Sequence, residues 1–327
     1  MAATLSPDRI LKELSDLWVS LGKPGETEAR AGVLRACSLT LVVLAEEAED
    51  VGELGETIAA LMPEHPARTI IIRLRGEGER TLSERVYAQC WMPFGQRRQI
   101  CCEQVEITAS DAALADLPPV VLPLAVPDLP LMVWCRSARL FGMPEFRRIA
   151  AMAAKVVIDS STMTDPSDAL RRLSDVSGHG VMIGDLAWTR ITRWRAMLSQ
   201  VFENRQTLAL IPGISRVHVA FAPGYDTAAW YMGAWISDCL GGRELTVEAD
   251  AGVSSLRVEL TGENLRVELM RQEGRLIVAV NEIRNCTSLS PPTDYLLMRE
   301  ELAIVRRDQV FERTLASAAR LAYSGNQ

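Results

Sequence analysis

The sequence lacks the short motifs that mark the common catalytic and nucleotide-binding sites. It contains no GxGxxG, GxxxxGKS/T, GxSxG or HExxH pattern. Histidine occurs only three times, at His65, His179 and His218, and none has a neighbouring nucleophile or metal-ligand partner in the sequence. We therefore expect no histidine-dependent catalytic triad, no cofactor and no catalytic site, while a mechanism based on carboxylates stays open.

A long apolar run and a secretory leader are also missing. A helix needs about 20 apolar residues to span a bilayer, and the longest candidate, residues 117–133, is interrupted by five prolines. The first ten residues contain no basic region followed by an apolar run. We therefore expect a cytoplasmic protein without a membrane partner.

Basic clusters of the kind that bind nucleic acid are absent as well. The formal net charge is −7, lysine is scarce, and arginines are scattered among carboxylates. Phosphate backbones require clustered basic side chains. The sequence therefore argues against a nucleic-acid partner, whereas arginine's planar fork suits carboxylate or phosphate pairing at an interface.

The seven cysteines contain no CxxC pair, so neither a zinc ribbon nor a thioredoxin-like site is indicated. Most lie in apolar, strand-like runs, which favours buried reduced thiols. Cys101 and Cys102 would point to opposite faces of a strand, so they are not expected to pair with each other. A redox switch stays open.

A chain of 327 residues suggests two domains. Strand and helix patterns alternate through residues 1–204, which predicts an α/β domain with an open, mostly parallel sheet. Residues 205–327 predict a smaller α+β domain with an antiparallel meander and a long C-terminal helix over about 293–323. Within the meander, LRVEL-TGEN-LRVEL (256–269) predicts a hairpin that places Leu256 opposite Leu269 and Glu259 opposite Arg266.

Polar residues follow three expected strands of the first domain. Arg136 follows LMVWC, Asp159 and Ser160 follow KVVI, and Asp185 follows VMIG. Open α/β sheets bind ligands at the carboxyl ends of their strands, so these side chains could line a crevice for a sugar phosphate or nucleotide. The alternative is that both aspartates cap the following helices and pair with arginine.

Residues 185–195, DLAWTRITRWR, are rich in tryptophan and arginine. Trp188, Arg190, Trp194 and Arg195 are of the types enriched at protein interfaces. Stacking of tryptophan on arginine within the fold is an equally good explanation.

Four segments together resemble one family. PLAVPDLPLMVWCRS (123–137), KVVIDSS (155–161), DLAWTRITRWRAMLSQVFE (185–203) and, less specifically, ARTIIIR (67–73) are similar to motifs of the glucose-6-phosphate dehydrogenase assembly protein (OpcA) family. The sequence departs from the family pattern at Trp134-Cys135, where paired tryptophans are commoner. The redox control discussed for cyanobacterial relatives is not transferred, because the cysteine positions match no motif.

The resemblance implies a non-catalytic protein whose partner is glucose-6-phosphate dehydrogenase. Such a protein would promote assembly or allosteric activation of that enzyme, at the start of the oxidative pentose phosphate pathway and its NADPH supply. The motifs carry over these candidate partner-binding or ligand-binding residues: Asp128, Trp134, Arg136, Asp159, Ser160, Asp185, Trp188, Arg190, Trp194 and Arg195.

Overall fold

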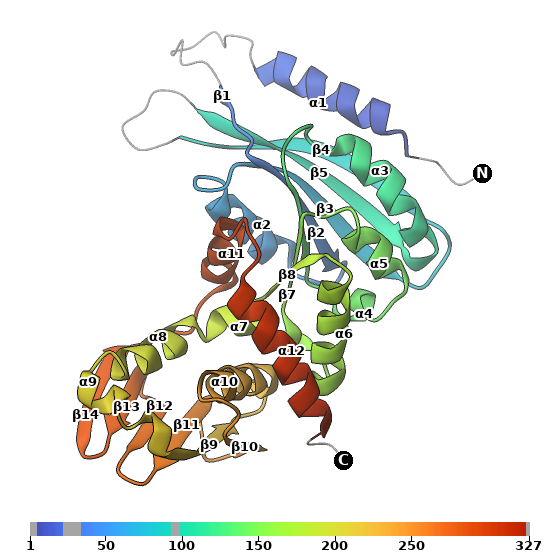
Figure 1. The fold of residues 1–327 in the computed structure, drawn as a ribbon. Helices are drawn as coiled ribbons and strands as arrows, with labels where there is room; N and C mark the ends of the chain where they lie inside the picture. The colour runs from blue at the N-terminus through green and yellow to red at the C-terminus, as the bar shows by residue number, and fades with distance from the viewer. Residues whose placement is uncertain (1–4, 22–33, 93–98, 325–327) are drawn as a thin grey trace. The chain divides into compact units, whose positions relative to one another are not determined.

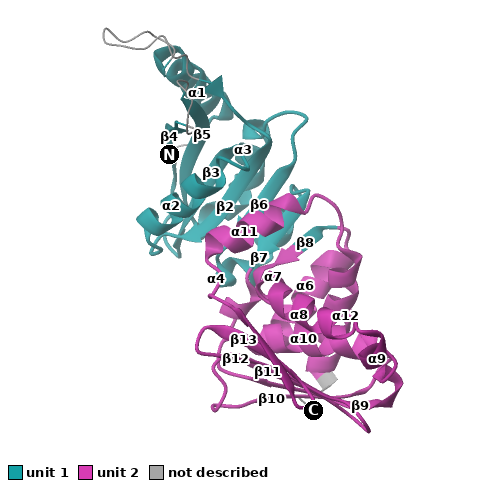
Figure 2. Ribbon diagram, turned by 90° about the vertical axis from the view of Figure 1, so that its left-hand side faces the viewer, with its two compact units in different colours: residues 1–158, 181–183 teal, residues 159–180, 184–327 magenta. Residues whose placement is uncertain are grey.

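The structure is a computed structural model that describes residues 5–21, 34–92 and 99–324 (Figure 1). The chain divides into two compact units (Figure 2). Unit 1 contains residues 1–158 and 181–183, and unit 2 contains residues 159–180 and 184–327. We expect a boundary between two separately folding domains near residue 204, and this boundary stays a prediction.

Unit 1 is built on a mostly parallel sheet, as the alternating pattern predicts. Its strands run in the order β1-β5-β3-β2-β6-β7-β8, and β4 pairs antiparallel with β5. They are β1 (Leu34–Arg35), β2 (Leu39–Glu46), β3 (Ala67–Gly76), β4 (Leu82–Trp91), β5 (Ile100–Ser110), β6 (Leu131–Cys135), β7 (Lys155–Ile158) and β8 (Met182–Asp185), whose last two residues belong to unit 2. The central strands β2, β3 and β6 are almost wholly buried because they are covered on both faces.

Helices cover both faces of this sheet (Figure 1). They are α1 (Pro7–Leu21), α2 (Val51–Leu61), α3 (Leu117–Leu124), α4 (Ala138–Phe141) and α5 (Glu145–Ala150). The proline-rich pattern does not predict α3. It forms because Pro118 and Pro119 stand in its first turn, where backbone N–H groups have no helical partner. Among the described residues, no helix is both long and apolar enough to cross a bilayer.

Unit 2 combines a mixed sheet with packed helices. Its strands run in the order β10-β9-β11-β12-β13-β14, with β10 parallel to β9 and the others antiparallel. They are β9 (Ile214–Phe221), β10 (Glu244–Ala249), β11 (Leu256–Gly262), β12 (Arg266–Gln272), β13 (Arg275–Val280) and β14 (Ile283–Ser288). The helices are α6 (Pro166–Gly178), α7 (Leu186–Arg190), α8 (Thr192–Val201), α9 (Arg205–Leu208), α10 (Asp226–Cys239), α11 (Asp294–Ala303) and α12 (Gln309–Ser324). Helix α10 packs on β9 and β10, and α12 packs on α6 and α10.

Two details of unit 2 differ from the expectations. The hairpin has Val258 opposite Leu269 and Glu259 opposite Glu268, a register two residues away from the expected one. The expected pairing of Glu259 with Arg266 directly across the ladder is therefore wrong, although their side chains still approach to 3.4 Å. The C-terminal helical segment is interrupted between α11 and α12, where Asp308 accepts hydrogen bonds from the first N–H groups of α12.

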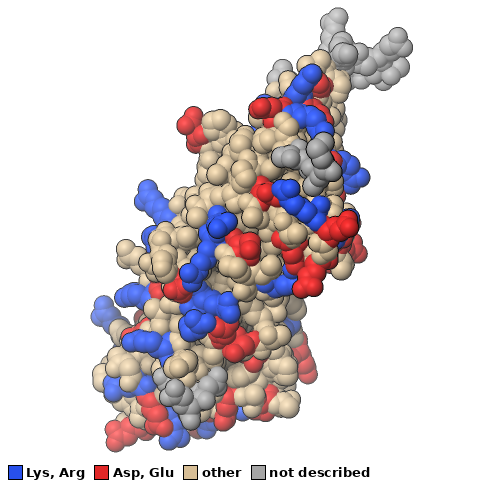
Figure 3. Space-filling view, turned by 90° about the vertical axis from the view of Figure 1, so that its right-hand side faces the viewer, with Lys and Arg blue, Asp and Glu red and all other residues tan. Residues whose placement is uncertain are grey.

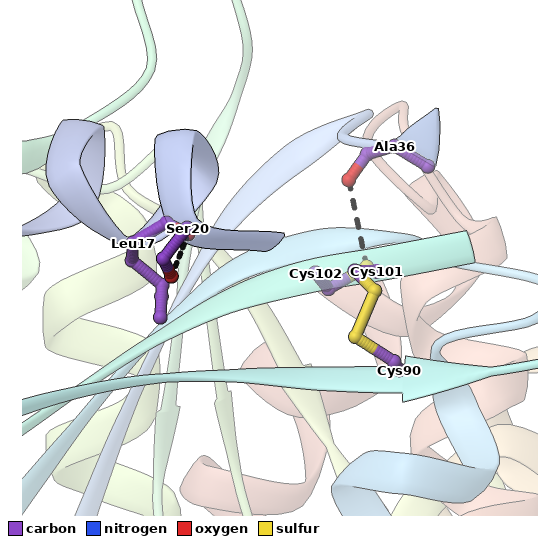
Figure 4. Close-up of a disulfide and its surroundings, with 6 residues drawn as sticks. All are labelled: Leu17, Ser20, Ala36, Cys90, Cys101 and Cys102. Carbon is purple, nitrogen blue, oxygen red and sulfur yellow. Dashed lines mark hydrogen bonds between the residues drawn. A yellow bond between two sulfur atoms is a disulfide. The ribbon is translucent and has the colours of Figure 1, made fainter. Parts of the chain in front are cut away.

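The cysteines also bring a correction. Cys90 and Cys101 lie opposite each other on β4 and β5 and form a disulfide (Figure 4). The expectation of reduced thiols is wrong for this pair. Cys102 does not pair with Cys101, as expected, and its thiol donates to the carbonyl of Ala36 at 3.5 Å. Burial raises the pKa of the Cys102 thiol to about 11 and that of Cys135 to about 12, so both stay protonated at neutral pH.

Candidate functional site

The strand order in unit 1 reverses direction beside β2. In similar sheets, such a reversal creates a crevice where ligands bind. From β2 the chain runs outward through β3 and β5, and it then returns to β6 on the other side of β2. In open α/β sheets, the crevice at such a switch point, beyond the carboxyl ends of the two central strands, is the usual binding site. We name the charged and polar residues found here, Glu46, Glu49, Asp111, Arg136, Ser137 and Arg139, the switch-point cluster.

Arg136, the first residue after β6, is held by contacts within unit 1. Its Nε lies 2.7 Å from a carboxylate oxygen of Glu49. Its guanidinium stacks on Trp134, 4.7 Å from the ring centroid, and Trp134 is only 1% exposed. The charge of Arg136 is therefore already paired with a carboxylate and a π face.

The remaining members of the cluster also pair with one another. Ser137 Oγ donates to Glu46, and Arg139 bridges Glu46 at 3.1 Å and Asp111 at 2.6 Å. Two guanidinium groups thus face three carboxylates in the cluster. An anionic ligand would have to displace these carboxylates, so the cluster as it stands disfavours a phosphate or pyrophosphate.

The start of α2 supports the same conclusion. Sheets that bind dinucleotides place a glycine-rich turn here, and the helix N–H groups face the phosphates. In this chain Asp50 accepts hydrogen bonds from the N–H groups of Gly52 at 2.7 Å and Glu53 at 3.2 Å. A carboxylate of the chain itself therefore occupies the donors that a phosphate would use.

A second polar cluster lies in the interior of unit 2, around Asp185. This carboxylate is fully buried and accepts hydrogen bonds from the N–H groups of Ser160 and Ala187, both at 3.0 Å, and from the hydroxyl of Tyr231 at 2.7 Å. Burial and the nearby charge of Asp159 raise the pKa of Asp185 to about 6. Through the bond to Ala187, Asp185 caps α7.

Asp159 lies beside this buried carboxylate and pairs with Arg190 at 2.7 Å. Its side chain also accepts hydrogen bonds from the backbone and hydroxyl groups of Ser161. Burial acts to raise the pKa of Asp159, but the hydrogen bond and charge of Arg190 outweigh it and hold that pKa below its usual value. Capping and pairing with arginine, the alternative to a ligand role for these aspartates, are therefore present in the structure.

The tryptophan- and arginine-rich segment 185–195 is largely internal to unit 2. Trp188 and Trp194 are each only 4% exposed. Trp188 packs against Tyr231 and Phe311, with ring centroids 5.8 Å apart in each case. The guanidinium of Arg195 lies 3.4 Å from the centroid of Trp188, so the stacking alternative is realised within the fold. A docking role for these residues stays a proposal.

The predicted site residues do not form one group. Asp128 stands alone in an exposed turn before β6, in the left-handed region at φ 63°. Trp134 and Arg136 belong to unit 1, and the predicted residues from 159 to 195 belong to unit 2. The shared crevice of Arg136, Asp159 and Asp185 stays a prediction.

Sequence reasoning missed the carboxylates and the arginine that complete the switch-point cluster. Glu46 and Glu49 belong to the acidic run that begins at the last residue of β2, so their signal is visible in the sequence. Asp111 follows β5, and only the register of the sheet brings it near Arg139. Within the described part of the chain, no group of histidine, cysteine, aspartate and glutamate side chains is arranged to hold a metal ion.

Two curated relatives share the name OxPP cycle protein OpcA. The chain is 24% identical to the one from Synechocystis sp. over 218 residues, which is 65% of this chain and 45% of that protein. It is 27% identical to the one from Synechococcus elongatus over 209 residues, 62% of this chain and 46% of that protein. The chain thus spans less than half the length of these relatives.

Among solved structures, a dehydrogenase from Chromobacterium violaceum has a similar fold, with a TM-score of 0.51. The similarity covers 88% of this chain and 94% of that one at 11% identity, and it concerns the fold alone. Residues 58–175 match the model of the glucose-6-phosphate dehydrogenase subunit N-terminal domain, and residues 181–315 match the model of the C-terminal domain. These two matches cover most of the sequence, and the chain belongs to the OpcA family.

Proposed function

We propose that the chain is a non-catalytic partner of glucose-6-phosphate dehydrogenase that promotes the assembly or the allosteric activation of that enzyme. It would thereby act at the start of the oxidative pentose phosphate pathway and influence NADPH supply. Membership of the OpcA family across both domains carries this proposal. Because the chain is shorter than its curated relatives, the partner is inferred for the residues present here.

The switch-point cluster supports a role without catalysis. The fold is shared with a dehydrogenase, yet carboxylates of this chain occupy the place and the helix donors that a dinucleotide would use. Because one fold can host unrelated functions, the shared fold does not require this chain to be a catalyst.

Exposed charge offers a way to locate the partner surface. One face of the molecule shows basic and acidic side chains interspersed rather than separated into patches of one sign (Figure 3). Arg193 on α8 is the exposed arginine of the segment 185–195. We therefore choose it as the probe of docking by this segment.

The decisive experiment combines the purified chain with the glucose-6-phosphate dehydrogenase of the same organism. Size-exclusion chromatography with light scattering and steady-state kinetics should reveal a complex, with a changed oligomer size or a lower KM for glucose 6-phosphate. Charge reversal in Arg193→Glu should weaken the complex about tenfold or more, as expected for an interface arginine. The matched reversal Arg205→Glu, at an exposed position on α9, should leave it unchanged.

Absence of a complex, together with unchanged kinetics at saturating chain, would refute the proposal. The alternative is an enzyme that uses Arg136, Asp159 and Asp185 on a sugar phosphate or nucleotide. That alternative requires the chain alone to turn over a phosphorylated metabolite and to lose this turnover in Asp159→Asn. Equal effects of Arg193→Glu and Arg205→Glu on the complex would indicate that the docking surface lies outside segment 185–195.

A further inference from the structure

A cavity of about 340 Å³ in unit 1 shares no lining residue with the switch-point cluster. It is bounded by one side of α2 and by the face of β3, β4 and β5 that α2 covers. Its volume is within the range of sites for small molecules, about 300–1,000 Å³. The residues around it are Val51, Gly52, Gly55, Glu56 and Ala59 from α2, and Ile71, Arg73, Tyr87, Gln89, Gln104 and Glu106 from the sheet.

Arg73 is the unusual member of this lining. The residue is only 4% exposed, and its Nε and Nη1 atoms have no hydrogen-bond partner among the described residues. Its neighbours across the ladders are Ala45 and Thr108, neither of which can balance its charge. A buried charge without a partner is strongly unfavourable, and buried guanidinium groups are normally paired with a carboxylate or phosphate.

The carboxylate of Glu106 does not fill this role. It pairs with Arg85 at 3.6 Å, and Arg85 lies over the ring of Tyr87. The pKa of Tyr87 is raised, first by burial and then by the charge of Glu106, so its hydroxyl keeps its proton at neutral pH. Tyr87 therefore adds a hydrogen-bond donor to the cavity that contains the unpaired guanidinium of Arg73.

Two amides add further polar groups. The amide of Gln104 donates to the side-chain oxygen of Gln89 at 2.9 Å. This bond leaves the NH₂ group of Gln89 as a donor and the carbonyl oxygen of Gln104 as an acceptor. The polar lining therefore contains the cation of Arg73, neutral donors and acceptors, and the carboxylates of Glu56 and Glu106 at its border.

The helix side of the cavity is shaped by missing side chains. Gly52, Gly55 and Ala59 lie on the same side of α2, and a Cβ atom added at Gly55 would meet no atom within 4 Å. Glycine inside a helix lowers its stability by about 1 kcal/mol relative to alanine. The space next to Arg73 therefore exists because α2 has glycine at position 55, where a larger residue would make the helix more stable.

We propose that this cavity binds a small organic carboxylate, with its charged group on Arg73 and its polar remainder on Tyr87, Gln89 and Gln104. A carboxylate matches the planar guanidinium through two parallel hydrogen bonds. It also carries a single negative charge. A phosphate dianion is disfavoured, because Glu56 and Glu106 also border the cavity.

Thermal unfolding of the full chain tests the proposal with acetate, glycolate, L-lactate and inorganic phosphate as probes, each against sodium chloride of equal ionic strength. At 100 times its dissociation constant, at least one carboxylate should raise the unfolding temperature by about 5 °C in a saturable way. Calorimetric titration should give one site per chain. No saturable shift with any of the three carboxylates, or a larger shift with phosphate, would overturn the assignment.

Two variants separate binding from stability. Arg73→Met removes the charge at similar length; it should abolish the shift and leave the ligand-free chain at least as stable as the parent. Gly55→Leu fills the cavity without changing its charge and should also abolish the shift, whereas Gly55→Ala should retain it. A carboxylate shift that persists in Arg73→Met, or a lower unfolding temperature of Arg73→Met without ligand, contradicts the proposal.

Discussion

Replacement of Asp185 by asparagine should change how the stability of unit 2 depends on pH. The pKa of this buried carboxyl is about 6, against an ordinary value of 3.8. Between these two values the folded chain binds more protons at this site than the unfolded chain does, so stability falls as pH rises. The complete titration corresponds to about 3 kcal/mol of unfolding free energy, of which about 2 kcal/mol is lost between pH 4 and pH 7.

Asparagine has the same shape and cannot ionise, so the variant escapes this loss. Its carbonyl oxygen can still accept from the N–H groups of Ser160 and Ala187, which Asp185 binds in the parent. The unfolding free energy of Asp185→Asn, relative to the parent, should therefore increase by about 2 kcal/mol between pH 4 and pH 7. Changes at titrating groups that do not interact with Asp185 cancel in this comparison.

Urea unfolding followed by tryptophan fluorescence measures the effect, because Trp188 and Trp194 are buried in the same unit. The control is Asp159→Asn. The pKa of Asp159 is lowered by Arg190, so its ionised form stabilises the fold above pH 4, and its replacement should destabilise unit 2 at neutral pH. Parallel pH profiles for the parent and Asp185→Asn would refute the reasoning about the buried carboxylate.

Three further predictions concern stability and use the same urea assay. Trp188→Ala should lower the unfolding free energy by about 3–5 kcal/mol because it empties a buried aromatic cluster; a similar loss in Tyr323→Ala, at a position 60% exposed, would contradict this explanation. Reduction of the disulfide should destabilise the parent by about 2–3 kcal/mol, given the short loop between Cys90 and Cys101. The same response to reductant in the double variant Cys90→Ser/Cys101→Ser would point to another thiol. Asp50→Ala should destabilise by about 1 kcal/mol through loss of the cap of α2, and Asp50→Asn should retain most of that stability; equal losses would exclude the capping role.

The buried strands of unit 1 could be predicted from the sequence because both faces of a parallel sheet require apolar residues. LTLVVLA and LMVWC are nearly continuous apolar runs, and they form the adjacent strands β2 and β6. The exact neighbours of each strand were harder to predict. The sequence offers no local signal that the chain returns from β5 to β6 across the sheet, and that return creates the switch point.

The hairpin of β11 and β12 shows why the register failed. A shift of two residues keeps Val258, Leu260, Val267 and Leu269 on the buried face, so the apolar pattern cannot distinguish the two registers. The expected register follows from a four-residue loop at 261–264, and the cross-strand charge pairs that it offers contribute only about 0.2–1 kcal/mol each. In the structure the strands continue to the turn, where Gly262 donates to the carbonyl of Leu265 at 2.8 Å.

The unpaired Arg73 and the disulfide depend on contacts that no local pattern encodes. Arg73 follows an apolar run on β3, and only the neighbouring strands reveal that it lacks a carboxylate. The disulfide requires Cys90 and Cys101 to lie opposite each other, which follows from the exact pairing of β4 and β5.

The buried motif residues limit where a partner can bind. Asp185, Trp188 and Arg195 already bond or stack within unit 2, and Asp159 holds Arg190. A partner could contact the buried Asp185 and Trp188 only by opening the fold and breaking these bonds, at a free-energy cost similar to that of unfolding the cluster. Substitutions at these positions should therefore weaken a complex in proportion to the stability they remove. A substitution at exposed Arg193 that weakens the complex at unchanged stability would instead mark a direct contact, and comparing the two classes of variant separates recognition from folding.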